Sequence, residues 1–248
     1  MLRGLLRVSA RLLATLIVER QPCVVLTGAG ISTESGIPDF RSPTGIWADI
    51  DPIEVASIDA FRSDPGRVWE FYGHRLGMLG DIEPNAGHRA IVELERRGLV
   101  TAVVTQNVDG LHQLAGSRDV VEVHGSLATA VCPACGGRVS IDEVRRLLAG
   151  VPVPLCPSCA TPLKPGVVMF GELLPVAAID RATSLARAAG LVLVVGSSLE
   201  VWPVAGLPLE AAAFAIVNLG PTTLDDQALV KIEGGAGETL AAVAAQLT

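Results

Sequence analysis

Four of the five cysteines form two close pairs whose spacing suits a metal ion. Cys132 and Cys135 are followed, after twenty residues, by Cys156 and Cys159. Each Cys-x-x-Cys pair can place two thiolates on one ion, and this spacing is typical of a four-cysteine zinc site. Four thiolates complete a tetrahedral shell and leave no position for water or substrate. We therefore expect one structural zinc ion, with four unrelated thiols or a redox pair as the alternatives.

A glycine-rich turn follows the first short apolar run. Gly28-Ala29-Gly30 comes directly after residues 23–26, and such a turn lets backbone N–H groups approach a phosphate. No third glycine stands in register, and no acidic residue ends the second strand as in the usual dinucleotide pattern. Taken alone, the turn fits a phosphate site and a plain tight turn equally well.

His124 is the candidate for proton transfer among the four histidines. An imidazole titrates near neutral pH and can take a proton from a hydroxyl group. A lone histidine before a glycine is more often structural than catalytic, so position alone leaves both readings open. We expect His112 to be a packed, hydrogen-bonded helix residue, and His74 and His88 to be structural as well.

Short apolar, β-branched runs alternate with helical stretches along the chain. Strands are predicted at residues 23–26, 100–105, 191–195 and 214–218, and helices at 87–97 and 176–189. Strands that are apolar on both sides of the pleat indicate a parallel sheet covered on both faces. The predicted class is α/β, a Rossmann-like doubly wound parallel sheet.

Two segments break this alternation and predict inserts. Residues 132–165 are rich in Pro, Gly and Cys and are expected to form a zinc ribbon. Residues 36–80 run from a proline-bearing loop into a helix, with Ser63 or Asp64 as N-cap and Pro65 at the first helical position. The remaining residues, 1–35, 81–131 and 166–248, are assigned to the Rossmann-like domain.

Composition narrows the classes of function. The chain has 248 residues, half of them hydrophobic and 18% charged, which is enough for one large core. A net charge of -7 offers no electrostatic footprint for nucleic acid, so we expect no such partner. No apolar run reaches the length of a membrane span, and we expect a cytoplasmic monomer that does not bind membranes.

The N-terminal stretch and the fifth cysteine have plain structural readings. Residues 1–18 carry arginines and no acids, which also suits a targeting peptide. The spacing of Leu5, Leu6, Leu12, Leu13 and Leu16 instead favours a first helix packed on the core. No secretory signal accompanies the cysteines, so a disulfide framework is not expected, and Cys23 is predicted to be a buried, unreactive thiol.

Several motifs together resemble one family. They are GAGIS at 28–32, GIPDFR at 36–41, TQNVDGLH at 105–112, VHG at 123–125, VGSS at 195–198 and VN at 217–218. These motifs, with the cysteine pairs between them, closely resemble the sirtuin signature and cover nearly the whole chain from residue 24 to residue 240. Two positions depart from it, since Met169 stands where the family usually has tryptophan and Gly166 where a polar residue is common.

The resemblance implies NAD as cosubstrate, acylated lysine peptides as partners and His124 as the catalytic residue. The residues it implies for NAD are Gly28, Ala29, Gly30, Ile37, Asp39, Phe40, Arg41, Trp47, Gln106, Asn107, Val108, Asp109, Gly196, Ser197, Ser198, Asn218, Leu219, Gly220 and Ala236. Those it implies for the acylated peptide are Ala56, Tyr72, Arg75, Val168, Phe170, Gly171, Glu172, Leu199, Glu200 and Val201. In the implied reaction the acyl oxygen attacks the nicotinamide ribose, nicotinamide leaves, and His124 activates the neighbouring hydroxyl to give free lysine and acylated ADP-ribose.

The helix predicted after Pro65 carries the signal for the acyl group. Tyr72 and Arg75 lie three residues apart and share one helix face. A phenol and a guanidinium in an apolar acyl tunnel would bind a distal carboxylate, and small Ala56 would leave room for it. This set resembles the sirtuins that remove succinyl and malonyl groups, so we expect a desuccinylase and demalonylase with some deacetylase activity. An ordinary deacetylase, an ADP-ribosyltransferase of the same family, and a non-catalytic sensor of NAD are the alternatives.

Overall fold

The structure is a computed structural model that describes the backbone of residues 2–247 and, within the first helix, side chains from residue 9 onward. In this range a six-stranded parallel sheet has the order β3-β2-β1-β7-β8-β9, and a three-stranded antiparallel sheet has the order β5-β4-β6. The strands are β1 (Cys23–Thr27), β2 (Ala102–Thr105), β3 (Val120–Glu122), β4 (Gly125–Val131), β5 (Arg138–Ser140), β6 (Lys164–Val167), β7 (Leu191–Val195), β8 (Phe214–Asn218) and β9 (Lys231–Glu233). The predicted α/β class with a Rossmann-like parallel sheet is confirmed.

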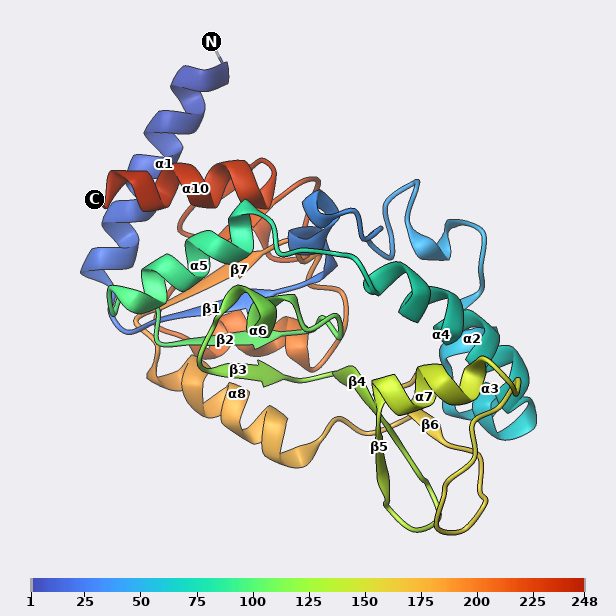
Figure 1. Ribbon diagram of the computed structural model, residues 1–248. Coiled ribbons are helices and arrows are strands. Elements are labelled where there is room, and N and C mark those ends of the chain that lie inside the picture. The colour runs from blue at the N-terminus through green and yellow to red at the C-terminus, as the bar shows by residue number, and fades with distance from the viewer. Residues whose placement is uncertain (1, 248) are drawn as a thin grey trace.

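Helices cover both faces of the large sheet, as the two-sided apolar strands require. Val25 and Leu193 face α1 (Leu2–Glu19), α5 (Ala86–Arg96) and α10 (Ala236–Gln246), whereas Val24 and Val194 face α8 (Val176–Ala188). Figure 1 shows α1, α5 and α10 on one side of the sheet and α8 on the other. Burial of the strands on both faces fixes the sheet as the centre of the molecule.

The first helix confirms the structural reading of the N-terminal stretch. Its buried side chains in the described range are Ala10, Leu13, Ala14 and Ile17. Leu12, which was expected on the packed face, is 48% exposed, because it lies beside the buried face. The side chains of residues 5 and 6 lie outside the described part. Cys23 is fully buried, and burial raises the pKa of its thiol to about 12, in agreement with an unreactive core cysteine.

The carboxyl ends of β1 and β7 approach each other closely, and glycines permit this contact. Gly30 donates its backbone N–H to the carbonyl oxygen of Gly196, at 2.8 Å. A Cβ at Gly28 or Gly30 would lie 2.7 or 2.8 Å from the Gly196 backbone, so no larger residue fits there. The segment after the turn is the 3₁₀ helix η1 (Ala29–Ser35), a different and shorter element than the α-helix of the usual dinucleotide-binding unit.

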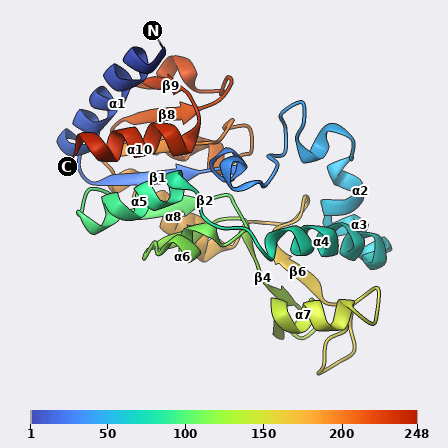
Figure 2. The same cartoon turned by 45° about the horizontal axis from the view of Figure 1, so that its top comes forward.

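A second layer of structure stands beside the sheet's carboxyl edge. The loop of residues 36–51 contains η2 (Ile46–Ala48) and leads into α2 (Pro52–Ala56), α3 (Ile58–Ser63) and α4 (Pro65–Leu79). Asp64 caps α4 by accepting the Arg67 N–H, with Pro65 at the first position, as the sequence predicts. Figure 2 shows α2, α3, α4 and α7 (Ile141–Leu148) set apart from the large sheet.

The small sheet and α4 share one apolar core. Trp69, Tyr72 and Leu76 of α4 pack with residues of the small sheet and with Val144 of α7. The Trp69 indole N–H also donates to the carbonyl oxygen of Leu163, at 2.6 Å. We propose the same three-part division as the sequence, with inserts at residues 36–80 and 132–165, and with β4 leading into the second insert.

The remaining elements connect the large sheet. They are α6 (Leu111–Ala115), α9 (Leu207–Glu210), η3 (Val204–Gly206) and η4 (Asp225–Gln227). Across the described residues, none of the helices has the length and apolar character that a bilayer crossing requires.

Candidate active site

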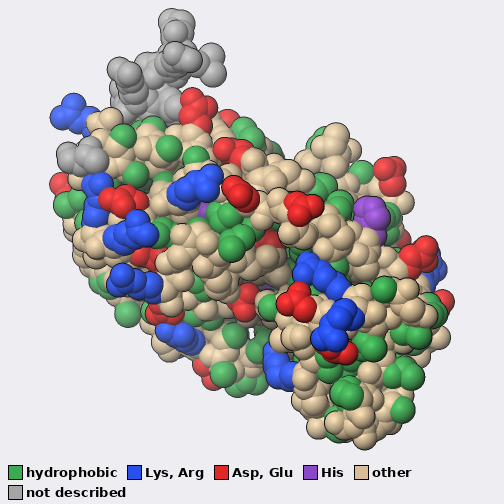
Figure 3. Space-filling model, in the orientation of Figure 1, with side chains coloured by type: hydrophobic (Ala, Val, Ile, Leu, Met, Phe, Trp, Pro, Cys, Tyr) green, Lys and Arg blue, Asp and Glu red, His purple; other side chains and the backbone are tan. Residues whose placement is uncertain are grey.

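A cavity of about 990 Å³ runs along the carboxyl edge of the large sheet and reaches under α4. All of the residues predicted for cofactor and substrate line it except two. The exceptions, Ile37 and Leu199, are buried side chains, 7% and 1% exposed, and Leu199 belongs to the core beneath the sheet. On the face shown in Figure 3, the surface is indented where the larger part of the molecule meets the smaller, and basic side chains there are interspersed with acidic ones.

His124 lies between β3 and β4 and lines the cavity. Its Nδ1 is 3.1 Å from the carbonyl oxygen of Gln106. A carbonyl can only accept, so Nδ1 carries the hydrogen and Nε2 keeps a lone pair for an incoming proton. Burial lowers the pKa of His124 below its usual 6.5, opposed by the Gln106 carbonyl and assisted by the positive charge of Arg41. The imidazole is therefore neutral at pH 7, which is the form a general base needs.

Asn107 and Asp109 are held in place by a serine that the sequence analysis did not assign. The Ser32 hydroxyl donates to Asp109 Oδ2 at 2.7 Å and accepts from Asn107 Nδ2 at 3.2 Å. Asn107 Nδ2 also donates to the carbonyl oxygen of Gly28, at 3.1 Å. The glycine turn and the 106–109 loop thus form one polar unit. No local sequence signal reveals this, because Ser32 and Asp109 are 77 residues apart.

Arg75 occupies the end of the cavity under α4. Its side chain is buried, and Nη1 has no hydrogen-bond partner among the described residues. The guanidinium carbon lies 5.1 Å from the Phe40 ring centroid and 5.8 Å from that of Phe71. Burial lowers the pKa of Arg75, but a guanidinium remains charged in proteins. A buried cation without a paired anion is energetically costly, which makes Arg75 a candidate ligand for a negatively charged group.

Tyr72 and Phe71 complete the walls around Arg75. Tyr72 is buried, and burial raises the pKa of its phenol to about 12, so the hydroxyl keeps its proton and can donate it in a hydrogen bond. Phe71 was not assigned from the sequence, although its position four residues before Arg75 places both on one helix face. Phe71 stacks on Trp47 at 5.7 Å and meets Tyr72 edge-on at 5.1 Å.

The resemblance places the peptide between residues 166–172 and residues 198–201, and each of these segments carries an acidic residue that pairs within the chain. Glu172 Oε2 accepts from Lys164 Nζ and from the Met169 backbone N–H, both at 2.9 Å. Glu200, on the opposite edge, forms an ion pair with Arg41 at 3.0 Å. These contacts shape the segments 164–172 and 198–201 that border the cavity. Met169 is 2% exposed; it packs in the core shared by α4 and the small sheet and also lines the cavity.

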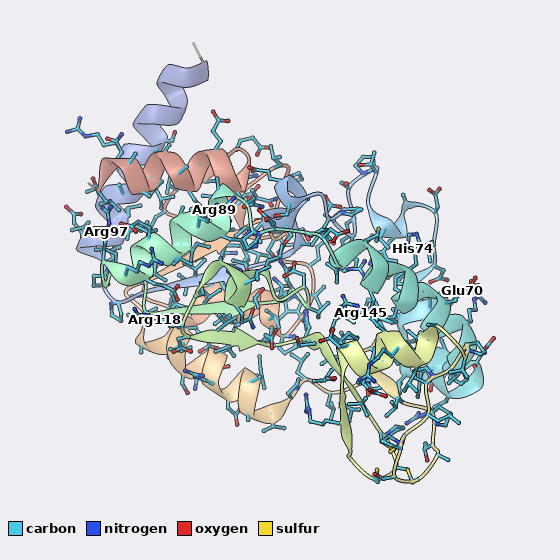
Figure 4. All side chains as sticks on the ribbon, viewed as in Figure 1. Glu70, His74, Arg89, Arg97, Arg118 and Arg145 are labelled. Carbon is cyan, nitrogen blue, oxygen red and sulfur yellow. The ribbon has the colours of Figure 1, made fainter. Side chains whose placement is uncertain are left out.

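The other histidines are not part of the cavity lining. His88 and His112 are buried, with ring centroids 4.9 Å apart, and His112 Nε2 lies 2.9 Å from Thr27 Oγ1. His88 caps α5 together with Asn85. These two are structural, as predicted. His74 is exposed on α4, so it is not a packing residue (Figure 4).

The buried histidine pair predicts a loss of stability in acid. Burial lowers the pKa of His88 to about 4 and of His112 to about 3. Above pH 6.5 neither state binds these protons. Below pH 6.5 the unfolded chain binds them and the folded chain does not, so the free energy of unfolding falls. Between pH 7 and pH 5.5, His112→Gln is expected to reduce this fall by about 1 kcal/mol in urea unfolding. An equal fall in the parent and in the variant would refute this account.

The four cysteines of the two pairs converge. Their Sγ atoms all lie within 4.8 Å of one another, with Cys132 to Cys159 at 3.4 Å and Cys135 to Cys156 at 3.6 Å. Four thiolates around zinc at about 2.3 Å would be about 3.8 Å apart, so the cluster fits a tetrahedral ion. All four positions of such an ion are filled by protein, which makes the zinc structural.

Comparisons with known proteins agree with this geometry. The model of the Sir2 family matches residues 28–203. An NAD-dependent protein deacetylase of Caldivirga maquilingensis is 44% identical over 92% of this chain and 89% of the relative. NAD-dependent protein deacylase 2 of Pyrobaculum aerophilum is 46% identical over 92% of this chain and 91% of the relative.

Solved structures give the same result. A Sir2 protein with a deacetylated p53 peptide and 3'-O-acetyl ADP ribose has a TM-score of 0.91 at 39% identity, covering 95% of this chain and 97% of that one. Sir2Tm bound to a propionylated peptide has a TM-score of 0.84 at 40% identity, covering 91% and 93%.

Fold and site together define a Rossmann-like protein with a large cavity at the carboxyl edge of its sheet and a four-cysteine cluster that fits a structural zinc ion. The chain belongs to the Sir2 family, the sirtuins. It is an NAD-dependent protein deacylase, and NAD is its cosubstrate.

Proposed function

We propose that this enzyme removes acidic acyl groups, succinyl and malonyl, from lysine side chains, and acetyl groups less efficiently. The observation that carries the proposal is the guanidinium of Arg75, a cavity-lining residue whose buried Nη1 has no hydrogen-bond partner in the described structure. An acetyl group has no distal acceptor that could bind Arg75. A distal carboxylate would form an ion pair with the guanidinium and would also accept a hydrogen bond from the Tyr72 hydroxyl. Buried Ala56 lines the same cavity and occupies little of it.

The peptide is proposed to enter as an added strand between the segments 166–172 and 198–201. The solved relatives are described with a p53 peptide and with a propionylated peptide, which supports a peptide substrate for this chain. Backbone hydrogen bonds in such a groove give affinity without demanding one sequence. Both segments border the cavity that contains His124 and Arg75, so one acylated lysine side chain could reach both residues.

His124 is proposed as the general base. Bound NAD supplies a ribose whose hydroxyl group can take over the acyl group. His124 receives the proton of that hydroxyl at Nε2, while the Gln106 carbonyl holds the ring through Nδ1. Asn107, Asp109 and Ser32 hold the polar wall beside it. The contribution of these residues is orientation and exclusion of water.

The decisive test compares matched succinyl and acetyl peptides by kcat/KM. We expect the succinyl peptide to be preferred, and Arg75→Met to reduce that preference by about 30-fold or more, because loss of a buried charge pair costs roughly 2 to 5 kcal/mol. Arg67→Met is the matched control, because Arg67 lies on the same helix, is half exposed and pairs with Glu54. Equal efficiency with both peptides would instead assign the chain as an ordinary deacetylase, as the Caldivirga relative is named.

A further inference from the structure

We infer that Phe40, on the cofactor side of the cavity, is a specificity-determining residue for the acyl group because it positions the Arg75 guanidinium. The inference rests on the proposed acyl preference and extends it. It assigns a role in substrate choice to the 36–51 loop, which otherwise borders only the part of the cavity assigned to NAD. The direct contact of the loop with the guanidinium is made by Phe40, because Arg75 lies over the Phe40 ring at 5.1 Å.

Hydrogen bonds within the 36–51 loop hold its conformation. The Asp39 side chain accepts the Ser42 N–H at 2.8 Å, and the Asp39 carbonyl oxygen accepts the Ile46 N–H at 2.8 Å. Trp47 donates its backbone N–H to the carbonyl oxygen of Phe40 at 3.0 Å, and the two rings stack at 5.2 Å. The loop therefore presents Phe40 and Trp47 together, as one aromatic surface.

This surface meets α4 at the acyl end of the cavity. Trp47 stacks on Phe71, and both Phe40 and Phe71 approach the Arg75 guanidinium. Aromatic rings attract a guanidinium through its planar faces, whereas a carboxylate binds its N–H edge. The two kinds of partner can therefore act at once. Aromatic contacts restrict the orientation of the guanidinium and do not use the hydrogen-bonding capacity of Nη1, which has no partner among the described residues.

The contact between Arg75 and Phe40 joins the acyl end of the cavity to its cofactor side, so any coupling through this contact must be reciprocal. If the loop orients Arg75, then Arg75 also stabilises the loop conformation that borders the cofactor. A partly buried cation–π contact is worth about 0.5 to 2 kcal/mol, so the effect in either direction should be several-fold. The coupling can therefore be tested by two measurements, one of acyl preference and one of nucleotide affinity.

The first measurement is a double-mutant cycle on acyl preference. Phe40→Leu is expected to lower the succinyl-to-acetyl ratio of kcat/KM by about fivefold. Phe40→Tyr keeps the aromatic face and is expected to keep the parent ratio. In an Arg75→Met background, Phe40→Leu should no longer change the ratio. Ile50→Ala, an exposed position of the same loop, should leave the ratio unchanged. The inference is overturned if Phe40→Leu lowers the two efficiencies by the same factor.

The second measurement needs no acyl substrate. Arg75→Met should weaken binding of ADP-ribose to the peptide-free enzyme by about threefold, and Arg67→Met should not. Unchanged affinity in Arg75→Met overturns the coupling. The two proposals fail separately. An acyl preference that survives Arg75→Met overturns the proposed function, whereas a preference lost in Arg75→Met but unmoved by Phe40→Leu overturns this inference alone.

Discussion

His124→Ala is expected to lower the rate of lysine deacylation by about 100- to 10,000-fold, the usual contribution of a positioned general base. The imidazole lines the cavity and is oriented by the Gln106 carbonyl, and Ala leaves no group there that could receive the proton. The measurement is the rate of free lysine formation from an acylated peptide at saturating NAD. His74→Ala, an exposed imidazole on α4, is the matched control and should keep the parent rate.

The same assignment fixes the direction of the pH dependence. Burial lowers the pKa of His124 from its usual 6.5, and a base must be neutral to act. Activity should therefore persist below pH 6.5 and fall only as the pH drops through the lowered value. An acid limb of log kcat/KM centred above pH 6.5, or a His124→Ala variant that deacylates at the parent rate, would rule out His124 as the base.

The four central strands of the large sheet could be predicted from the sequence because they carry their own signal, whereas the three-residue edge strands β3 and β9 were not predicted. The strands at 191–195 and 214–218 are apolar on both sides of the pleat, and their predicted limits agree with the structure. The antiparallel strands of the small sheet could not be predicted. Lys164–Val167 contains a proline and a glycine, and it becomes a strand only by pairing with β4, more than thirty residues earlier in the chain. Pairing over such distances has no local signature.

The candidate site likewise contains residues that the sequence could predict and residues that it could not. Residues within long motifs, such as Asn107, Asp109 and His124, could be assigned because the motif carries them, and they line one cavity. Phe71 has only a helical spacing to Arg75 to mark it. Ser32 lies within the GAGIS motif, but its contact with Asp109 has no local signal because it is a tertiary contact. The glycine turn shows most clearly that a motif alone does not reveal why its residues are required. Its close contact with Gly196 is a second reason for Gly28 and Gly30, independent of any phosphate.

Removal of the zinc ion is expected to abolish activity, although the ion lies outside the catalytic cavity. The four cysteines anchor a segment rich in Pro and Gly, and structural zinc supplies about 10 to 16 kcal/mol in small zinc modules at neutral pH. The core of that module includes Trp69 and Tyr72, so its unfolding would release α4 and with it Arg75. The metal therefore supports the acyl end of the cavity through shared packing.

Cys156→Ser, or treatment with a strong chelator, should lower the bound zinc from one ion per chain, lower the melting temperature and remove deacylation of both succinyl and acetyl peptides. Tryptophan emission should shift to longer wavelength, because Trp69 is 1% exposed in the folded chain. Cys23→Ala is the matched cysteine control. It leaves a small cavity in the sheet core but should retain one zinc ion per chain, since Cys23 lies in β1 and outside the cluster. A zinc-free protein with parental melting and activity would show that the module folds without the metal, because the packing of α4 against the small sheet would then suffice to hold Arg75.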